Sequence, residues 1–372
     1  MKEFYLPSLD GIRACAFLLV FIAHAGLENI VPGGLGVTIF FFLSGYLITT
    51  LLRREFVSTG DVSIRKFYLR RCLRILPPLY ITLAVGCAAA WFLPSMRSET
   101  TSGILSVFTY TYNYAALIND NAARLPAGMG VFWSLMIEEH FYFIFPLVYL
   151  ALSRSRLSRR WQSLLLGSAC ASCLAWRFCL VLIFHTPLLT LPRWTYSSTD
   201  TRFDAIAWGC ILAICWNPVF RDGPAIANRN RGKLALAGLS LLFLTLIVRN
   251  PVFRETARYS LQSVALFPIF HYCIALPDSF VSRCLQLTPL RWIGLLSYSM
   301  YLIHDFLLAI LRMQFHGSPP AIALSAFLFT ALYALTMRFC IEKPSRSLQR
   351  LLTGSRRALH TPHAVGAAAS AD

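Results

Sequence analysis

The feature that most constrains this chain is a series of apolar stretches, most of which are close to the roughly 20 residues that span a bilayer as a helix. A lipid-exposed backbone must satisfy its own hydrogen bonds, so we expect each stretch to be helical. The sequence therefore predicts an all-α integral membrane protein with about ten transmembrane helices, of which the two shortest, 203–217 and 234–248, fall below the usual spanning length. The stretches are 12–31, 35–52, 75–94, 130–152, 162–185, 203–217, 234–248, 258–276, 292–311 and 320–339.

The positions of the basic residues predict how the chain sits in the membrane. Only 14% of the residues are charged, against about 25% in a typical soluble domain. The net charge of +17 does not indicate nucleic-acid binding, because 25 of the 34 lysines and arginines fall in every second connecting segment and in the two terminal segments. By the positive-inside rule this pattern places both termini in the cytoplasm of a multi-pass protein of the cell inner membrane. The bilayer is its first partner, and no protein partner is indicated.

We expect one membrane domain, residues 1–345, and no soluble domain that folds separately. Residues 346–372 are first basic and then rich in alanine, which predicts a disordered cytoplasmic tail. The eleven cysteines are scattered, mostly within the apolar stretches, and we interpret them as small packing residues. No metal site is predicted, because no loop carries a cysteine pair at metal-ligand spacing.

The first apolar stretch, LDGIRACAFLLVFIAHAG, carries two ionisable residues, Arg13 and His24. Eleven residues at 100° each make three turns plus 20°, so both residues share one face of a helix, about 16.5 Å apart. Arg13 can be an anchor at the inner edge of the membrane, and His24 can be a buried residue that bonds a neighbouring helix. Ionisable groups inside a membrane are nevertheless functional by default. We therefore predict a functional role for His24.

The segment FWSLMIEEHFYFIFPL places Glu138 and Glu139 side by side in the outer half of an apolar span. Adjacent residues on a helix point about 100° apart, so the two carboxylates cannot face one partner. One of them can hold the imidazole of His24, which would raise its basicity toward a hydroxyl group, while the other faces a loop or water. The alternative is an interfacial acidic pair at the mouth of the helix.

Basic residues gather before the third span, in RKFYLRRCLRILPPLY. A spacing of three puts Arg71 and Arg74 together on one helical turn, where they can grip a phosphate group. As anchors of membrane topology they would need no ligand at all. They indicate a ligand only in combination with an anionic cofactor.

Two further polar groups lie within apolar helices. In LSYSMYLIHDF, Ser297, Tyr301 and His304 follow at i, i+4 and i+7, which predicts a stripe that lines either a helix contact or a cavity. In TDTRFDAIAWG, Arg202 and Asp204 can bind a polar acceptor or pair with each other, and we favour the pair.

The second span contains Ser44 and Gly45 within FFFLSGYLIT. Gly45 permits the close approach of another backbone, and Ser44 is most simply a hydrogen-bond donor between helices. A nucleophilic role for Ser44 would need the G-x-S-x-G turn, which is absent from this segment.

Taken together, these motifs resemble those of one family, the acyltransferase type 3 family of integral-membrane O-acyltransferases. The resemblance extends over residues 8–345, and the ordered set is specific although no single motif is decisive. The matching segments, in family order, are LDGIRACAFLLVFIAH, FFFLSGYLIT, RRCLRILPPLY, FWSLMIEEHFY, TRFDAIAWGCILA, SYSMYLIH and IEKP.

The resemblance implies ten transmembrane helices with cytoplasmic termini and the transfer of an acyl group, commonly acetyl from acetyl-CoA, to a hydroxyl of a cell-envelope polysaccharide, lipopolysaccharide or similar glycoconjugate. It makes His24 the catalytic residue, as a base or as the carrier of the acyl group, with Arg13 and Glu138 beside it. Arg71 and Arg74 become candidates for the phosphates of acyl-CoA. The candidates for substrate contacts are Glu139, Arg202, Asp204, Tyr301 and His304. A transporter or flippase for an anionic or glycolipid substrate is the alternative.

Overall fold

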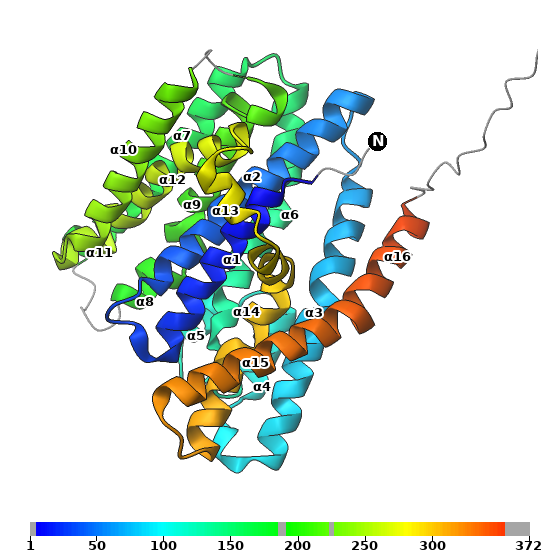
Figure 1. Ribbon diagram of the computed structural model, residues 1–372, viewed down its shortest axis with the longest axis vertical. Helices are drawn as coiled ribbons and strands as arrows, with labels where there is room; N and C mark the ends of the chain where they lie inside the picture. The colour runs from blue at the N-terminus through cyan, green and yellow to red at the C-terminus, as the bar shows by residue number, and fades with distance from the viewer. Residues whose placement is uncertain (1–4, 185–190, 223–226, 354–372) are drawn as a thin grey trace, which may run out of the picture.

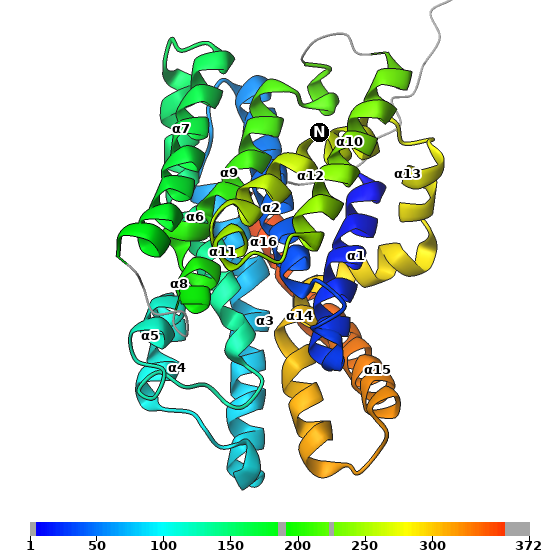
Figure 2. The same ribbon diagram turned by 90° about the vertical axis from the view of Figure 1, so that its left-hand side faces the viewer.

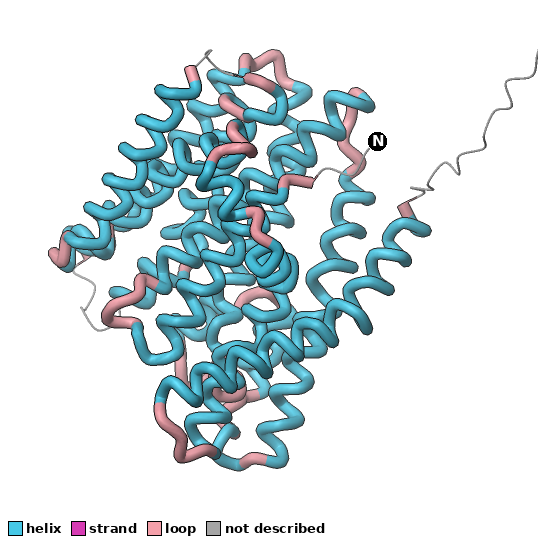
Figure 3. Tube along the Cα trace, in the orientation of Figure 1, coloured by secondary structure: helices cyan, strands magenta, loops and turns pink. Residues whose placement is uncertain are grey.

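The computed structural model describes residues 5–184, 191–222 and 227–353. Within these ranges the chain forms helices joined by short loops, without strands (Figure 3). Ten long helices coincide with the ten predicted spans, so the all-helical membrane fold is confirmed (Figure 1). They are α1 Pro7–Ile22, α2 Gly33–Thr59, α3 Ile64–Phe92, α6 Trp133–Arg154, α7 Arg159–Phe178, α9 Thr199–Cys215, α10 Asn228–Ile247, α12 Ala257–Ala275, α14 Thr288–Gln314 and α15 Pro319–Met337.

Shorter helices occupy the connections between the long ones. Three π-helical turns, Ala23–Leu27, Cys179–Ile183 and Arg338–Glu342, directly continue α1, α7 and α15. Three 3₁₀ turns are Pro94–Met96, Gly130–Phe132 and Pro218–Phe220. The short α-helices are α4 Thr101–Phe108, α5 Tyr112–Ile118, α8 Leu191–Ser197, α11 Pro251–Glu255, α13 Phe280–Leu285 and α16 Lys343–Leu352.

Nine helical segments of the described chain are long and apolar enough to cross a membrane. The chain is a multi-pass membrane protein. The two stretches that looked too short, 203–217 and 234–248, both belong to such segments, because the helices there begin several residues earlier than the apolar runs. The predicted span that is not among the nine is α12. Its polar Ser260, Gln262 and Ser263 are buried against neighbouring helices rather than exposed to lipid.

Glycines set the closest helix contacts. α2 packs most extensively on α9, and a Cβ atom on Gly45 would overlap the carbonyl oxygen of Ile206 on that helix. Gly209 has the reciprocal relation to the carbonyl oxygen of Phe42. The predicted close approach at Gly45 is thus confirmed. α1 packs on α14 in the same way, because Gly294 lies against the backbone of Asp10.

The long helices form a bundle in which α1 and α2 are central and α7 and α10 peripheral (Figures 1 and 2). In Figure 2, α7 and α10 begin at the upper end, whereas α4 and α5 lie at the lower end beside the last turns of α3. The basic connections before α3, α7 and α10 therefore share one end of the bundle, which we call the basic face.

The beginning of the predicted disordered tail is ordered. Residues 343–352 form α16, which runs beside α3 and follows the π-helical turn at the end of α15 (Figure 1). The prediction of disorder from residue 346 is therefore wrong for this segment, because the helix gains contacts with α3 that composition alone does not reveal. Residues 354–372 lie outside the described residues.

Candidate active site

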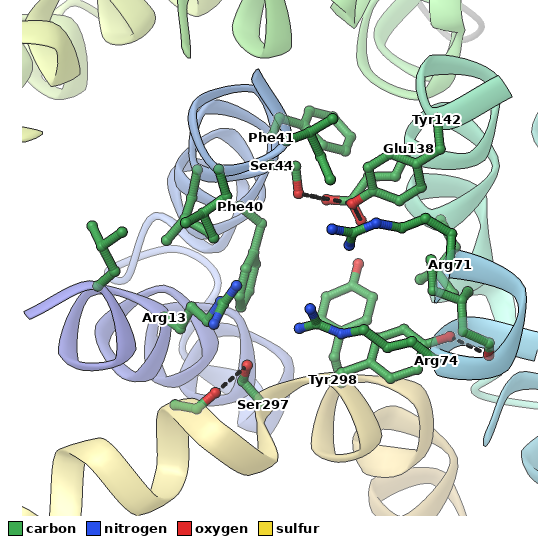
Figure 4. Close-up of a pocket in the computed structure, with 18 of the residues that line it drawn as sticks. Arg13, Phe40, Phe41, Ser44, Arg71, Arg74, Glu138, Tyr142, Ser297 and Tyr298 are labelled. Atoms are coloured by element: carbon green, nitrogen blue, oxygen red, sulfur yellow. Dashed lines mark hydrogen bonds between the residues drawn. The ribbon is translucent and has the colours of Figure 1, made fainter. Parts of the chain in front are cut away.

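A cavity of about 260 Å³ lies among α1, α2, α3, α6 and α14 (Figure 4). The helices bring together polar side chains that are widely separated in the sequence. Tyr5 precedes α1 and lines the same cavity. Burial raises the pKa of its phenol above the ordinary value. The polar lining comprises Tyr5, Asp10, Arg13, Ser44, Arg71, Arg74, Ser134, Glu138, Glu139, Tyr142, Ser297, Tyr298, Tyr301 and Arg346.

The side chains of four arginines line this cavity, one of them Arg346 of α16. Those of Arg71 and Arg74 reach in from α3, and that of Arg13 faces them from α1 (Figure 4). Arg13 donates to the carboxylate of Asp10 at 3.2 Å, whereas Arg71 and Arg74 form no ion pair with any described residue. The neighbouring Arg70, in contrast, is paired with Glu55 at 2.9 Å. The predicted placement of Arg71 and Arg74 together on one helical turn is confirmed, and both side chains face the cavity.

The two glutamates of α6 also face the cavity. Glu138 accepts hydrogen bonds from Ser44 at 2.7 Å and from Tyr142 at 3.1 Å. Ser44 is thus the predicted donor between helices, although it lines the cavity as well. The Oε1 atom of Glu139 is buried and has no hydrogen-bond partner among the described residues. The cavity therefore contains unpaired groups of both signs.

His24 lies outside this cavity, and its partners are not the predicted ones. Its Nδ1 atom lies 2.9 Å from Nε2 of His304, with the two rings stacked at a centroid distance of 5.1 Å, and 3.7 Å from Oδ1 of Asp305. Arg312 donates to its backbone carbonyl. The expected contact between Glu138 and His24 is wrong, because the carboxylate of Glu138 is already engaged by α2 and by Tyr142 of its own helix.

The polar stripe of α14 extends from the cavity to His24. Ser297 and Tyr301 line the cavity, while His304 contacts His24, so both predicted uses of the stripe occur in one helix. The rings of Tyr301 and His304 are 5.4 Å apart, and Nδ1 of His304 lies 2.7 Å from the carbonyl oxygen of Tyr301. On α1, Arg13 lines the cavity, whereas His24 contacts His304 of α14.

Sequence reasoning missed Asp305. This residue follows His304 directly in the apolar segment LIHDF, and an acid at that depth was the available signal. Its side chain is 28% exposed and that of His24 is 38% exposed, whereas His304 is fully buried. One side of the imidazole therefore faces His304 and Asp305, and the other is accessible.

The predicted pair of Arg202 and Asp204 does not form. Asp204 instead binds Arg177 at 2.7 Å, with both side chains fully buried, and accepts from Ser260. Arg202 donates to the hydroxyl of Thr38 at 2.9 Å, and its guanidinium lies 4.1 Å from the ring centroid of Tyr259. Neither residue lines the cavity. Residues two apart point to different sides of a helix, which directs them to different neighbours.

Comparisons with known proteins agree with this arrangement of motifs. The family described as "Acyltransferase domain" matches residues 6–339. A peptidoglycan O-acetyltransferase of Listeria monocytogenes is 30% identical over 311 residues, which cover 81% of this chain and 49% of the relative. A putative peptidoglycan O-acetyltransferase of Bacillus subtilis is 31% identical over 366 residues, which cover 92% and 55%. The chain thus spans about half the length of the curated relatives it matches, and no solved structure matches it.

Proposed function

The chain belongs to this acyltransferase family, and from that premise we propose that it is an O-acetyltransferase that moves an acetyl group from acyl-CoA to a hydroxyl of a cell-envelope glycan. The observation that carries the proposal is the pair of polar places along α14. One is a cavity with unpaired arginines beside the basic face, and the other is an accessible histidine at the far end of α1.

The arginine cavity suits the donor. Coenzyme A carries a diphosphate and a 3′-phosphate, and guanidinium groups bind such oxygens through paired hydrogen bonds. Arg71 and Arg74 supply two cations without ion-pair partners in the described chain, and Arg13 adds a third from the opposite wall. Positive-inside reasoning predicts that this end of the bundle faces the cytoplasm, where acyl-CoA is made.

His24 suits the transfer step. Because Nδ1 faces His304 and Asp305, Nε2 is the atom left to take a proton from the acceptor hydroxyl. The hydroxyl oxygen then attacks the thioester carbonyl, the carbon–sulfur bond breaks, and the proton passes on to the thiolate that leaves. Asp305 stabilises the positive charge that develops on the imidazole. Asp305 takes over the role that the sequence assigned to Glu138.

The acceptor side is the end of α1 opposite the basic face. The printed names of the two relatives concern peptidoglycan, so we propose a peptidoglycan-type glycan as the acceptor ahead of lipopolysaccharide. The accessible edge of His24 and the exposed residues that follow it, such as Glu28 and Ile30, leave room for a large polymer.

The test uses membranes that contain the full chain and radiolabelled acetyl-CoA. His24→Ala should reduce the labelling of envelope glycan by at least about 100-fold, the usual share of general base catalysis, with no change in the amount of protein in the membrane. The matched control is His316→Ala, which removes an exposed histidine from the loop after α14. Full labelling by His24→Ala would contradict the mechanism. Movement of a glycolipid without consumption of acetyl-CoA would support a flippase instead.

A further inference from the structure

A second, larger hollow lies on the opposite flank of the bundle, between α7, α9, α10 and α12. It is a groove of about 870 Å³ that shares no lining residue with the arginine cavity. Its residues lie at the beginning of α7, at 231–241 of α10, and from the middle of α9 and α12 onward, at 208–216 and 264–271, so they extend from the end nearest the basic face to about the middle of the bundle. It is therefore a feature of one leaflet.

The walls of this groove are apolar and as long as one leaflet is thick. They include Ile211 and Trp208 of α9, Leu234 and Leu241 of α10, and Phe267 of α12. The lining of α10 runs from Arg231 to Leu241, about 15 Å at 1.5 Å per residue. That is half of the roughly 30 Å hydrocarbon core of a bilayer. A single acyl chain of one leaflet matches this length.

The end of the groove at the basic face carries a concentration of positive charge. Arg159 and Arg160 stand at the start of α7, and Arg231 stands opposite on α10. Of these three, Arg159 binds the carboxylate of Asp222 at 2.7 Å, and Asp222 is shared with Arg53. Arg160 and Arg231 have no carboxylate partner among the described residues. The charge of this end is therefore complementary to a phosphate group.

Two buried donors on the lining also lack partners. The Nε atom of Arg231 and the Nε1 atom of Trp208 have no hydrogen-bond acceptor among the described residues. A buried donor without a partner has lost its hydrogen bonds to water without replacing them, which is unfavourable. The phosphate and ester oxygens of a phospholipid accept hydrogen bonds and donate none. A phospholipid in the groove would therefore supply acceptors for these two donors.

The packing of the helices explains why the groove stays open. α9 packs on α2 and α7, whereas α10 packs chiefly on α12. In the membrane-spanning window of α10 only 17% of residues are buried, the smallest share of the nine spans of the described chain. α10 is therefore held on one side only. An occupant between α9 and α10 would hold the other side.

We propose that this groove is a binding site for an anionic phospholipid of the leaflet at the basic face. The phosphate lies between Arg160 and Arg231, and one acyl chain follows the wall formed by α9 and α10. Basic pockets between transmembrane helices on the cytoplasmic side are suited to such headgroups. The lipid fixes α10 to the body of the bundle.

The test is native mass spectrometry of the full chain in a neutral detergent, titrated with phosphatidylglycerol or with phosphatidylcholine of the same chains. We expect one phosphatidylglycerol to bind in preference to phosphatidylcholine. Arg160→Gln with Arg231→Gln should weaken that binding by roughly 5-fold for each charge. The matched control, Arg156→Gln with Arg229→Gln, removes two charges at the same face that do not line the groove, and it should bind as the parent does.

A second pair of variants tests the acyl chain. Ala237 lines the groove, so Ala237→Trp fills the space without a change of charge, while Leu236→Trp adds the same ring on the adjacent exposed position. We expect only Ala237→Trp to abolish the preference. Equal binding of the two lipids by the parent chain, undiminished binding by the arginine variants, or displacement of the lipid by soluble glycerol phosphate would each overturn the proposal.

Discussion

Arg177 and Arg74 are both arginines within helices that cross the membrane, yet their surroundings are opposite. Arg177 is fully buried, with its guanidinium bound to Asp204, Ser260 and the carbonyl oxygens of Thr201 and Thr256. Arg74 shares a cavity with three other arginines and forms no ion pair with a described residue. The guanidinium of Arg177 has its partners within the protein, whereas that of Arg74 finds partners only in water or a ligand that enters the cavity.

This difference separates charges that hold the fold from charges available for a ligand. A buried ion pair is costly to assemble, but the loss of one partner leaves an uncompensated charge. A cation that faces a cavity keeps its solvation and is free to exchange water for phosphate oxygens. The presence of a charge in a membrane helix therefore does not identify a ligand-binding residue of this bundle. Its burial and its pairing do.

The largest expected effect is on Arg177, the arginine that is paired within the protein. Arg177→Leu leaves Asp204 buried without its partner, which costs about 3–5 kcal/mol, a large part of the 5–15 kcal/mol that stabilises a typical domain. We expect little folded protein in the membrane, as measured by monodisperse protein in detergent extracts. The double variant Arg177→Leu with Asp204→Leu should recover part of the yield.

A surface ion pair provides the control for that experiment. Arg193 and Asp120 are paired at 2.9 Å with both side chains more than half exposed, and Arg193→Gln should change the yield little, since exposed pairs contribute about 0–1 kcal/mol. A normal yield of Arg177→Leu would remove the distinction between the two kinds of arginine.

The second largest effect is expected for Arg74, the arginine that faces the cavity. Arg74→Gln should raise the KM for acetyl-CoA about 10- to 100-fold, because a charge-assisted hydrogen bond to phosphate contributes about 1.5–3 kcal/mol. The kcat should stay within about twofold, because the contact is equal in ground and transition states. The thermal stability of the variant should match that of the parent chain.

Arg70 is the matched control, since it lies one turn before Arg74 and is bound to Glu55. Arg70→Gln removes the same charge from the same helix and should leave the KM unchanged. Equal changes in KM for the two variants would indicate a general effect of the basic loop rather than a phosphate site.

The sequence predicted elements well and contacts between elements less well. The ten spans follow from apolar runs, and the neighbouring positions of Arg71 and Arg74 follow from helical spacing, because both depend on one segment at a time. The partners of Glu138 and of Asp204 depend on which helices cross and at what height. Contacts at Gly45, Gly209 and Gly294 set those crossings, and no single segment reveals them.

The same reason explains why Asp305 was overlooked. His24 and His304 are 280 residues apart, and nothing near either residue in the sequence shows that α1 and α14 bring them together. The role of His24 itself stays a prediction from the motif and from the accessible edge of its ring. In the structure the imidazole of His24 is contacted by residues of α14, whereas the sequence predicted a contact with α6.

The smallest effect concerns Asp305, which lies between the two kinds of charge because it is partly exposed and 3.7 Å from His24. Asp305→Asn keeps the shape but removes the charge that stabilises the imidazolium. Since His304 retains its contact at 2.9 Å, we expect kcat to fall only about tenfold, a fraction of what a general base contributes, at an unchanged KM for acetyl-CoA. Asp305→Glu, which keeps the carboxylate, should retain more activity than the Asn variant. A loss of thermal stability with unchanged kcat would instead place Asp305 with Asp204, among the residues that hold the fold.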